Sequence, residues 1–258
     1  MPEIASAAST PERRLAAPFR LPAAAVANVA AHAAAPPPIP RARARSRTAR
    51  DLALLAPGIG GFAALLVLVR ARRTEALDLA ITLRLQAIDH PLLELAMRAV
   101  SWPGFPPQSR LIPPAAALGL WLARARTESA LTLLAWTSGL TSEVIKRFMD
   151  RPRPVAGTDL RVVAADLGGT SFPSGHTLTY TVVYGWLAVV ADLLIRRRWV
   201  RRPVLAGLAA LVAGIGPSRI HLGHHWPSDV LASYLLGASH LAGLVLLERR
   251  LRTRPVAR

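Results

Sequence analysis

Long apolar runs separated by short polar segments are the dominant pattern along this chain. Residues 52–69 and 230–247 are each 18 consecutive uncharged, mainly apolar residues, and residues 177–195 form a 19-residue run interrupted only by Asp192. A transmembrane helix needs about 20 predominantly apolar residues to cross the hydrocarbon core of a bilayer. Each of these three runs therefore predicts a transmembrane helix.

Three shorter uncharged runs lie between the long ones, at residues 111–123, 129–142 and 203–218. Taken alone, runs of this length could be buried helices or re-entrant segments. Counted together with the long runs, they predict about six transmembrane helices.

Residues 75–100 have a different pattern, that of an amphipathic helix. Apolar positions recur there at helical spacing beside charged ones: Leu77, Ile81, Leu85 and Ile88 beside Glu75, Asp78 and Arg84. We expect this segment to lie on the membrane surface. The predicted fold is therefore all-α, a polytopic membrane helical bundle with a surface amphipathic helix.

The composition agrees with a membrane protein that has basic flanks. The chain has 32 Lys and Arg against 15 Asp and Glu, a net charge of +17, although 52% of its residues are hydrophobic. A soluble nucleic-acid binder of this charge would be more polar, and a disordered basic chain would lack the apolar residues. The sequence contains no cysteine, which excludes disulfides, thiolate metal ligands and cysteine nucleophiles.

Basic tails are expected at both ends of the chain. Residues 1–50 are rich in Ala, Pro and Arg, and we expect them to be disordered because mostly alanine broken by PPPIP can neither span a bilayer nor pack a core. An Arg-rich targeting peptide is the alternative for this segment. Residues 249–258 form the second tail. Both tails could contact anionic lipid, and no nucleic-acid partner is expected, because a basic tail needs only lipid to explain its charge.

The distribution of basic residues predicts an orientation. With six spans both termini share one side, which holds 20 of the Lys and Arg residues against 12 on the other side. The positive-inside rule then places the termini in the cytoplasm, although the cluster Arg70, Arg72 and Arg73 argues for the reverse. We expect an integral protein of a bacterial-type plasma membrane, with the remaining polar motifs on the extracytoplasmic side.

The first of these motifs is KRFMDRPRP, residues 146–154, at the end of the third expected span. Lys146, the only lysine of the chain, and Arg153 are separated by six residues, and the prolines on both sides of Arg153 stiffen the backbone there. The ammonium group of Lys146 and the planar guanidinium of Arg153 could hold a phosphoryl group between them. A membrane-flanking basic cluster is the alternative interpretation.

The second motif, FPSGH, occupies residues 172–176 immediately before the fourth expected span. Gly175 permits close backbone approach, Ser174 offers a hydroxyl, and the amides at a helix start favour an anion. His176 could donate a proton to a departing oxygen. A serine-capped helix with an incidental histidine is the alternative.

The third motif, PSRIHLGHHWPSDV, occupies residues 217–230 and joins the last two expected spans. The guanidinium group of Arg219 could donate hydrogen bonds to two phosphate oxygens at once. Because His225 and Asp229 are four residues apart, the carboxylate could hold the far N–H of the imidazole, fixing its tautomer and stabilising an imidazolium. Asp229 could equally be a first-turn acid favoured by the helix dipole, and both roles are compatible.

A metal site is the other interpretation of the histidines at positions 221, 224 and 225. The chain has no cysteine and few acids near these histidines, while several arginines and a lysine surround them. Such a pocket should repel a divalent cation, so neither a metal nor another cofactor is expected.

The three motifs, taken in order, resemble those of the type 2 phosphatidic acid phosphatase superfamily, which includes lipid phosphate phosphatases and is similar at its active site to vanadium-dependent haloperoxidases. The pattern consists of Lys146-x6-Arg153-Pro154, Pro173-Ser174-Gly175-His176 and Ser218-Arg219-x5-His225-x3-Asp229. The resemblance spans roughly residues 52–247, and residues 51–248 would form the membrane-embedded phosphatase domain.

The resemblance implies a role for each matching residue. His225 would attack phosphorus to give a phosphohistidine, Asp229 would orient it, and His176 would protonate the leaving oxygen and later activate water. The phosphoryl oxygens would be held by the remaining motif residues, Lys146, Arg153, Ser174, Gly175 and Arg219. The activity would be metal-independent, as fixed cations and amides can supply the charge neutralisation that phosphoryl transfer needs.

The implied substrate is a phosphate monoester or diphosphate on a membrane lipid or polyprenyl carrier, because the motifs lie at the ends of membrane spans. A lipid phosphotransferase that uses the same phosphohistidine is the alternative within enzymes. A haloperoxidase fits less well, because six apolar spans suit a bilayer. A transporter or membrane scaffold would also have apolar spans and an intramembrane Asp192, but it would leave the three ordered motifs unexplained.

Overall fold

The computed structural model describes residues 41–154, 160–162 and 169–253, and these are helical apart from the connecting segments. The helices, in chain order, are α2 (Arg41–Arg70), α3 (Glu75–Gln86), α4 (Pro91–Ser101), the 3-10 helix η1 (Trp102–Gly104), α5 (Gln108–Leu122), α6 (Arg126–Trp136), α7 (Ser138–Lys146), α8 (Gly175–Leu194), α9 (Arg198–His221) and α10 (Pro227–Thr253). No strand occurs in these ranges. The all-α prediction is therefore confirmed.

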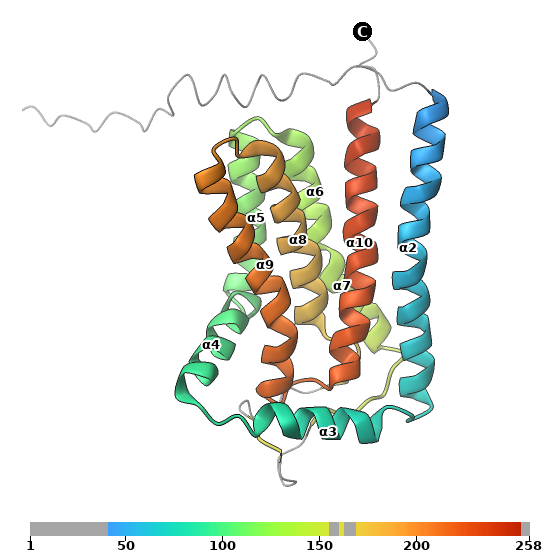
Figure 1. Ribbon diagram of the computed structural model, residues 1–258, viewed down its shortest axis with the longest axis vertical. Helices are drawn as coiled ribbons and strands as arrows, with labels where there is room; N and C mark the ends of the chain where they lie inside the picture. Colours follow the sequence, from blue (N-terminus) through green and yellow to red (C-terminus); the bar gives the residue numbers. More distant parts are fainter. Residues whose placement is uncertain (1–40, 155–159, 163–168, 254–258) are drawn as a thin grey trace, which may run out of the picture.

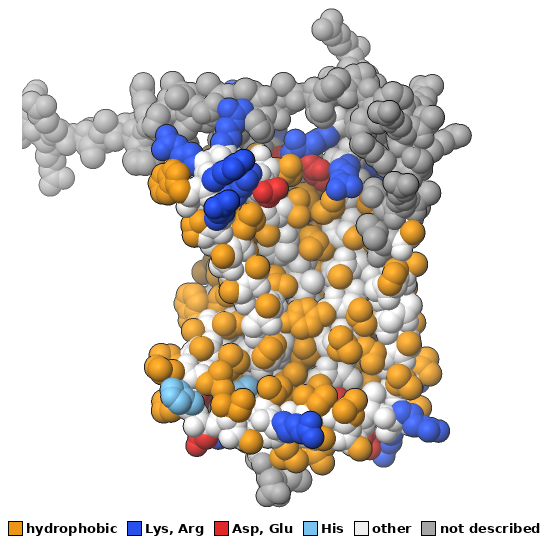
Figure 2. Space-filling model, viewed as in Figure 1, with side chains coloured by type: hydrophobic (Ala, Val, Ile, Leu, Met, Phe, Trp, Pro, Cys, Tyr) orange, Lys and Arg blue, Asp and Glu red, His pale blue; other side chains and the backbone are white. Residues whose placement is uncertain are grey.

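The bundle is elongated, and its long helices run parallel to its long axis (Figure 1). Helix α10 packs against α2 and α8, and α8 also packs against α9. Helix α3 lies across one end of the bundle, beneath α9 and α10 in the view of Figure 1. Hydrophobic side chains cover the middle of the visible face, and charged ones gather at its two ends (Figure 2). This distribution is that of a helical bundle embedded in a bilayer.

The six expected spans all coincide with helices, but they differ in length. Among the described residues, α8, α9 and residues 227–252 of α10 are long and apolar enough to cross a membrane. The end of α2 and α3 pass the same test only as a pair bent by 101°. The 15-residue α5, the 11-residue α6 and the 9-residue α7 are each shorter than a typical span. The length criterion therefore gives three to four spans rather than six.

Helix α8 lies at the centre of the largest apolar cluster. Leu178, Val182, Trp186 and Val190 recur every four residues on its buried face. They pack against Leu131 and Ala135 of α6 and Leu244 of α10. The indole Nε1 of Trp186 donates to Thr132 Oγ1 at 3.1 Å, which satisfies its buried polar group. Helix α8 is thereby packed between α6 and α10.

The expected surface helix over residues 75–100 is instead two helices. Pro91 begins α4, and the His90 side chain caps that helix by accepting from the Leu92 amide. In α3 the polar residues Asp78, Thr82 and Gln86 are buried, whereas Leu77 and Leu79 are exposed. The polar face of α3 therefore packs on the protein, and its apolar side chains point outward, as suits a helix at a lipid interface.

The expected tails are only partly described. Helix α2 begins at Arg41 and so includes the last ten residues of the expected N-terminal tail, and α10 continues into the expected C-terminal tail as far as Thr253. Residues 1–40 and 254–258 lie outside the described residues.

Candidate active site

The three motifs converge at the end of the bundle where α3 lies. A cavity of about 590 Å³ opens there among α5, α7, α8 and α9. Six residues of the motifs line it: Lys146, Arg153, Gly175, His176, Arg219 and His225. Stretches separated by up to 79 residues thus supply side chains to one cavity. Three of these side chains are cationic, so the cavity suits an anion.

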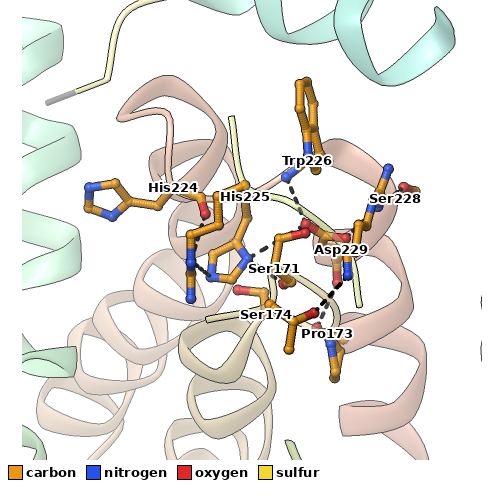
Figure 3. A network of polar contacts seen from close by, with 12 residues as sticks. Ser171, Pro173, Ser174, His224, His225, Trp226, Ser228 and Asp229 are labelled. Atoms are coloured by element: carbon orange, nitrogen blue, oxygen red, sulfur yellow. Dashed lines mark hydrogen bonds and ion pairs between the residues drawn. The ribbon is translucent and has the colours of Figure 1, made fainter. Parts of the chain in front are cut away.

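His225 lies in the loop between α9 and α10. Its Nδ1 lies 2.8 Å from the carbonyl oxygen of Ser171, and Figure 3 shows the ring pointing toward that residue. A carbonyl can only accept, so Nδ1 carries the proton. The neutral ring then has its lone pair on Nε2, which lies 3.4 Å from the Arg153 guanidinium in the cavity. His225 is therefore oriented as a nucleophile or a base.

Asp229 lies directly behind His225 in the first turn of α10. One carboxylate oxygen is 3.6 Å from His225 Nδ1 and accepts from the Trp226 amide at 2.9 Å. The other oxygen accepts from the Arg151 guanidinium. The sequence assigned the orienting role to Asp229 alone, but the Ser171 carbonyl is the nearer acceptor. Asp229 contributes mainly its charge, placed beside the imidazole N–H.

The start of α8 brings Gly175 and His176 to the cavity. Ser174 is the N-cap, and its Oγ accepts from the Thr177 amide at 3.4 Å. A Cβ on Gly175 would lie 3.3 Å from Ser142 Oγ and 3.8 Å from Lys146 Nζ, so glycine keeps this approach open. Ser174 itself is buried and does not line the cavity. The capping interpretation of Ser174 is therefore the one that the geometry favours.

His176 faces the cavity from the first turn of α8. Its ring packs edge-on against Phe105, with 4.9 Å between ring centroids. Its buried Nε2 has no hydrogen-bond partner among the described residues. A buried ring nitrogen at a cavity wall is available to exchange a proton with a group in the cavity.

Arg219, near the end of α9, is fully buried. Its Nη2 donates to Ser101 Oγ at 2.5 Å, and its guanidinium lies 5.1 Å from the centre of the Phe105 ring. Its Nε is buried without a partner in the described part of the chain. Residues just before α5 therefore fix the arginine while leaving donor capacity toward the cavity.

Lys146 and Arg153 complete the cationic wall. Lys146 Nζ donates to Glu143 Oε1 at 2.9 Å, and Arg153 Nη1 donates to the His224 carbonyl at 2.8 Å. Burial lowers the pKa of Arg153, and the carboxylates of Asp229 and Glu143 oppose that shift. An arginine keeps its charge in proteins at neutral pH. Lys146 and Arg153 both line the cavity.

The two adjacent histidines of the α9–α10 loop differ in their surroundings. Burial lowers the pKa of His225 below the usual value, with Asp229 raising it and Arg153 lowering it further. Burial, assisted by nearby cations, lowers the pKa of His224 to about 3. Figure 3 shows the His224 ring pointing away from His225 and Asp229. His224 is therefore a neutral buried ring, and His225 is the one that meets the cavity.

No metal-binding arrangement is found among the described residues, where no group of three or more His, Asp or Glu side chains could hold an ion. His221, the third histidine of the motif, lies 3.2 Å through Nδ1 from the Leu85 carbonyl. It contacts α3 and does not line the cavity.

Sequence reasoning missed several residues that build the site. Ser171 acts through its backbone carbonyl, which no residue-type pattern could reveal. Arg151 lies inside the first motif and could have been singled out, whereas Ser101 and Asp78 lie far from any motif.

The model of the PAP2 superfamily matches residues 127–252. A phosphatidylglycerophosphatase B of Bacillus subtilis (strain 168) is 30% identical over 186 residues, covering 67% of this chain and 85% of that protein. The undecaprenyl-diphosphatase BcrC of the same organism is 30% identical over 123 residues, 46% of this chain and 58% of that protein.

Solved structures agree in fold. The crystal structure of a transmembrane PAP2-type phosphatidylglycerolphosphate phosphatase from Bacillus subtilis superposes with a TM-score of 0.63 at 22% identity, covering 79% of this chain and all of that one. A match of this length and identity to a curated relative, together with the family model over all three motifs from Lys146 to Asp229, establishes the relationship. This chain belongs to the PAP2 superfamily.

Proposed function

We propose that this protein is a membrane phosphatase that hydrolyses a phosphate monoester or diphosphate on a lipid or polyprenyl carrier through a phosphohistidine. One observation carries the proposal: the three motifs together bring two histidines, His176 and His225, and three cations to the wall of one cavity. Family membership supports the reaction class, because the relatives are named as phosphatases of lipid phosphates.

The first step would be attack of His225 Nε2 on phosphorus. The N–P bond forms as the P–O bond to the leaving group breaks, and His176 donates a proton to the departing oxygen. The Ser171 carbonyl and Asp229 hold the Nδ1–H on the far side of the ring. They would stabilise the positive charge that the imidazole gains during attack. The lowered pKa keeps His225 neutral, and therefore nucleophilic, at neutral pH.

The second step would return the enzyme to its starting state. His176 accepts a proton from water, the water oxygen bonds to phosphorus, and the N–P bond to His225 breaks. Free phosphate and the neutral histidine result.

The phosphoryl oxygens would be held by Lys146, Arg153 and Arg219 together with the Gly175 amide at the N-terminus of α8. The helix dipole adds a partial positive charge there. Ser174 would act through its cap on α8 rather than by direct contact. Fixed cations and amides supply charge neutralisation without a metal, since phosphoryl transfer depends mainly on positioning and electrostatics.

The substrate class follows from where the cavity opens. Trp136, Leu140 and Val183 form part of its wall, beside the cationic residues. Trp136 and Leu140 are also exposed apolar side chains. A phosphate whose apolar tail stays in the bilayer could therefore reach the cationic end by lateral diffusion. This supports a lipid phosphate over a soluble one.

The orientation proposed from the sequence, with cytoplasmic termini and an extracytoplasmic site, agrees with the charge distribution. The arginines at positions 196–202 lie at the end of α8 and the start of α9, opposite the cavity. Figure 2 shows Lys and Arg gathered at that end of the visible face. The basic tails would contact anionic lipid on the same side.

The test is phosphate release by the detergent-purified full-length protein, given lipid phosphates, polyprenyl diphosphates and soluble phosphate esters. We expect release from lipid substrates that survives chelators and is inhibited by vanadate. Strict dependence on added magnesium, or activity only on soluble esters, would contradict the proposal. Adding candidate alcohol acceptors distinguishes hydrolysis from phosphotransfer, because a transferase would lose free phosphate to a new ester.

A further inference from the structure

A buried chain of charges runs from α3 to the back of His225. Asp78, Arg151 and Asp229 lie in line, and both carboxylates are at most 2% exposed. Arg151 Nη2 lies 2.6 Å from Asp78 Oδ2, and its Nη1 donates to Asp229 Oδ1. One guanidinium thus bridges two buried carboxylates from different helices.

Ser228 closes this network on the side of α10. Its amide donates to Asp78 Oδ1 at 2.8 Å, and its hydroxyl lies 2.7 Å from Asp78 Oδ2 and 2.8 Å from Arg151 Nη1. Every oxygen of Asp78 is therefore engaged, and the first turn of α10 is tied to α3. Such fully paired geometry is what a buried ion pair requires to persist.

None of these groups meets the cavity, so their effect on the reaction must pass through Asp229. Arg151 occupies the carboxylate oxygen remote from His225 and so fixes how the other oxygen faces the ring. Its positive charge also offsets part of the Asp229 charge. The negative charge of Asp78 in turn offsets part of the positive charge of Arg151.

We propose that Asp78 and Arg151 are positioning residues that set the orientation and effective charge of Asp229 behind the proposed nucleophile. The inference rests on the proposed function, in which His225 attacks phosphorus. It makes α3, the helix across the end of the bundle, a functional part of the site rather than a membrane anchor alone.

Titratable and charged groups from the neighbouring elements lie around His225 and Asp229. They are His176 from α8, Arg219 from α9, Arg153 and Arg151 from the segment before α8, His224 from its own loop and Asp229 from α10. The single change of charge at position 78 or 151 leaves all the others in place. Its effect can therefore be separated from theirs.

The two charges predict shifts of opposite sign. The acid limb of kcat/KM reports protonation of His225 in the free enzyme. Arg151→Gln removes a positive charge behind Asp229, so the acid limb should move to higher pH. Asp78→Asn leaves Arg151 uncompensated, so the limb should move to lower pH. Each shift should be roughly one pH unit.

The experiment measures phosphate release from a lipid phosphate in detergent between pH 4 and 9, for the full-length protein and its variants. Asp78→Asn should lower kcat by about 10- to 100-fold with little change in KM, as outer-shell partners do in other sites. The double variant Asp78→Asn with Arg151→Gln should return the limb toward its wild-type position, because both opposite charges are gone. Glu75→Gln is the matched control, since Glu75 is an exposed acid of the same helix that pairs only weakly with Arg72.

The outcome separates three possibilities. Opposed shifts that cancel in the double variant support the inference. Loss of activity in Asp78→Asn with an unmoved pH profile would mean that the network only stabilises the fold, and would overturn it. If wild-type protein releases no phosphate, or His225→Ala retains activity, the proposed function fails instead.

Discussion

Two of the cavities in the described part of the bundle have histidine in their walls, and these two cavities differ in charge. The cavity at the motif end is lined by Lys146, Arg153 and Arg219 around His225. The second, about 360 Å³ among α6, α7, α8 and α10, has His240 and the hydroxyls of Thr137, Ser138 and Thr141 in an otherwise apolar wall. None of the described residues that line this second cavity has a charged side chain.

The histidines themselves are also held differently. His240 Nδ1 lies 2.9 Å from the Leu236 carbonyl of its own helix, and its Nε2 lies 3.5 Å from Thr141 Oγ1. Both ring nitrogens are thus directed to groups of the bundle, the Leu236 carbonyl of α10 and the Thr141 hydroxyl of α7. His225 turns Nδ1 to the Ser171 carbonyl, and its Nε2 faces the cavity, where it lies 3.4 Å from the Arg153 guanidinium. A histidine beside a cavity is therefore not enough for phosphoryl chemistry, because converging cations and a ring nitrogen that faces them are needed as well.

The largest expected effect is the contrast between the two histidines. His225→Ala should reduce phosphate release by more than about 1,000-fold, because the group that forms the covalent bond is removed. His240→Ala should retain activity within about twofold under the same conditions. Steady-state assays on both purified variants measure this. Comparable losses of activity in the two variants would mean that the activity does not depend on the cationic cavity in particular.

The next effect concerns the cations that distinguish the two cavities. Arg219→Lys keeps a positive charge but loses the planar fork, and should lower kcat by about 100- to 1,000-fold, as removal of a preorganised donor does elsewhere. Arg201→Lys, at the opposite end of the bundle, is the matched control and should behave as wild type. Equal kcat values for the two variants would show that charge alone suffices at position 219.

The pH dependence sharpens the comparison further. Attack requires neutral His225, and burial lowers its pKa. Activity should therefore rise with pH through an acid limb that lies below the ordinary histidine value of about 6.5. A kcat/KM profile measured from pH 4 to 9 tests this. An acid limb above pH 6.5 would show that the carboxylate behind the ring outweighs burial and the cations.

The smallest effect is expected for Glu143, an exposed residue of the cavity wall. Glu143 is exposed and pairs with Lys146, so Glu143→Gln frees the lysine for an anionic substrate. KM should fall by about two- to fivefold with kcat nearly unchanged, since exposed ion pairs are weak. A rise in KM would indicate that Glu143 holds Lys146 in its working position instead.

Apolar runs determined how much of the fold could be predicted. The runs at residues 177–195 and 230–247 became α8 and α10 because burying their backbone in lipid leaves a helix as the stable choice. The orientation of α3 could not be predicted, because the partners of its buried polar residues are distant in sequence. Asp78 contacts Arg151 and Ser228, which lie 73 and 150 positions downstream. Periodicity shows that a helix has two faces, but not which face a partner covers.

The part of the site that consists of side chains in recognisable motifs could be predicted from the sequence. Lys146, Arg153, Gly175, His176, Arg219 and His225 all line the cavity. Ser174 does not, because its hydroxyl caps α8, and a serine before a helix supports either role. The carbonyl of Ser171 that orients His225 belongs to the backbone, so the residue type at position 171 could not reveal its role. Asp78 was missed because its partners lie on elements that only the folded bundle brings together.

Detection of the covalent intermediate tests the central claim most directly. The purified protein, mixed briefly with a lipid substrate labelled in its phosphate and quenched in alkali, should carry label that is acid-labile and mapped to His225 by mass spectrometry. His176→Ala should still become labelled when the leaving group is a good one, and should lose the label slowly. Turnover without any labelled histidine, or label that persists in His225→Ala, would contradict the account.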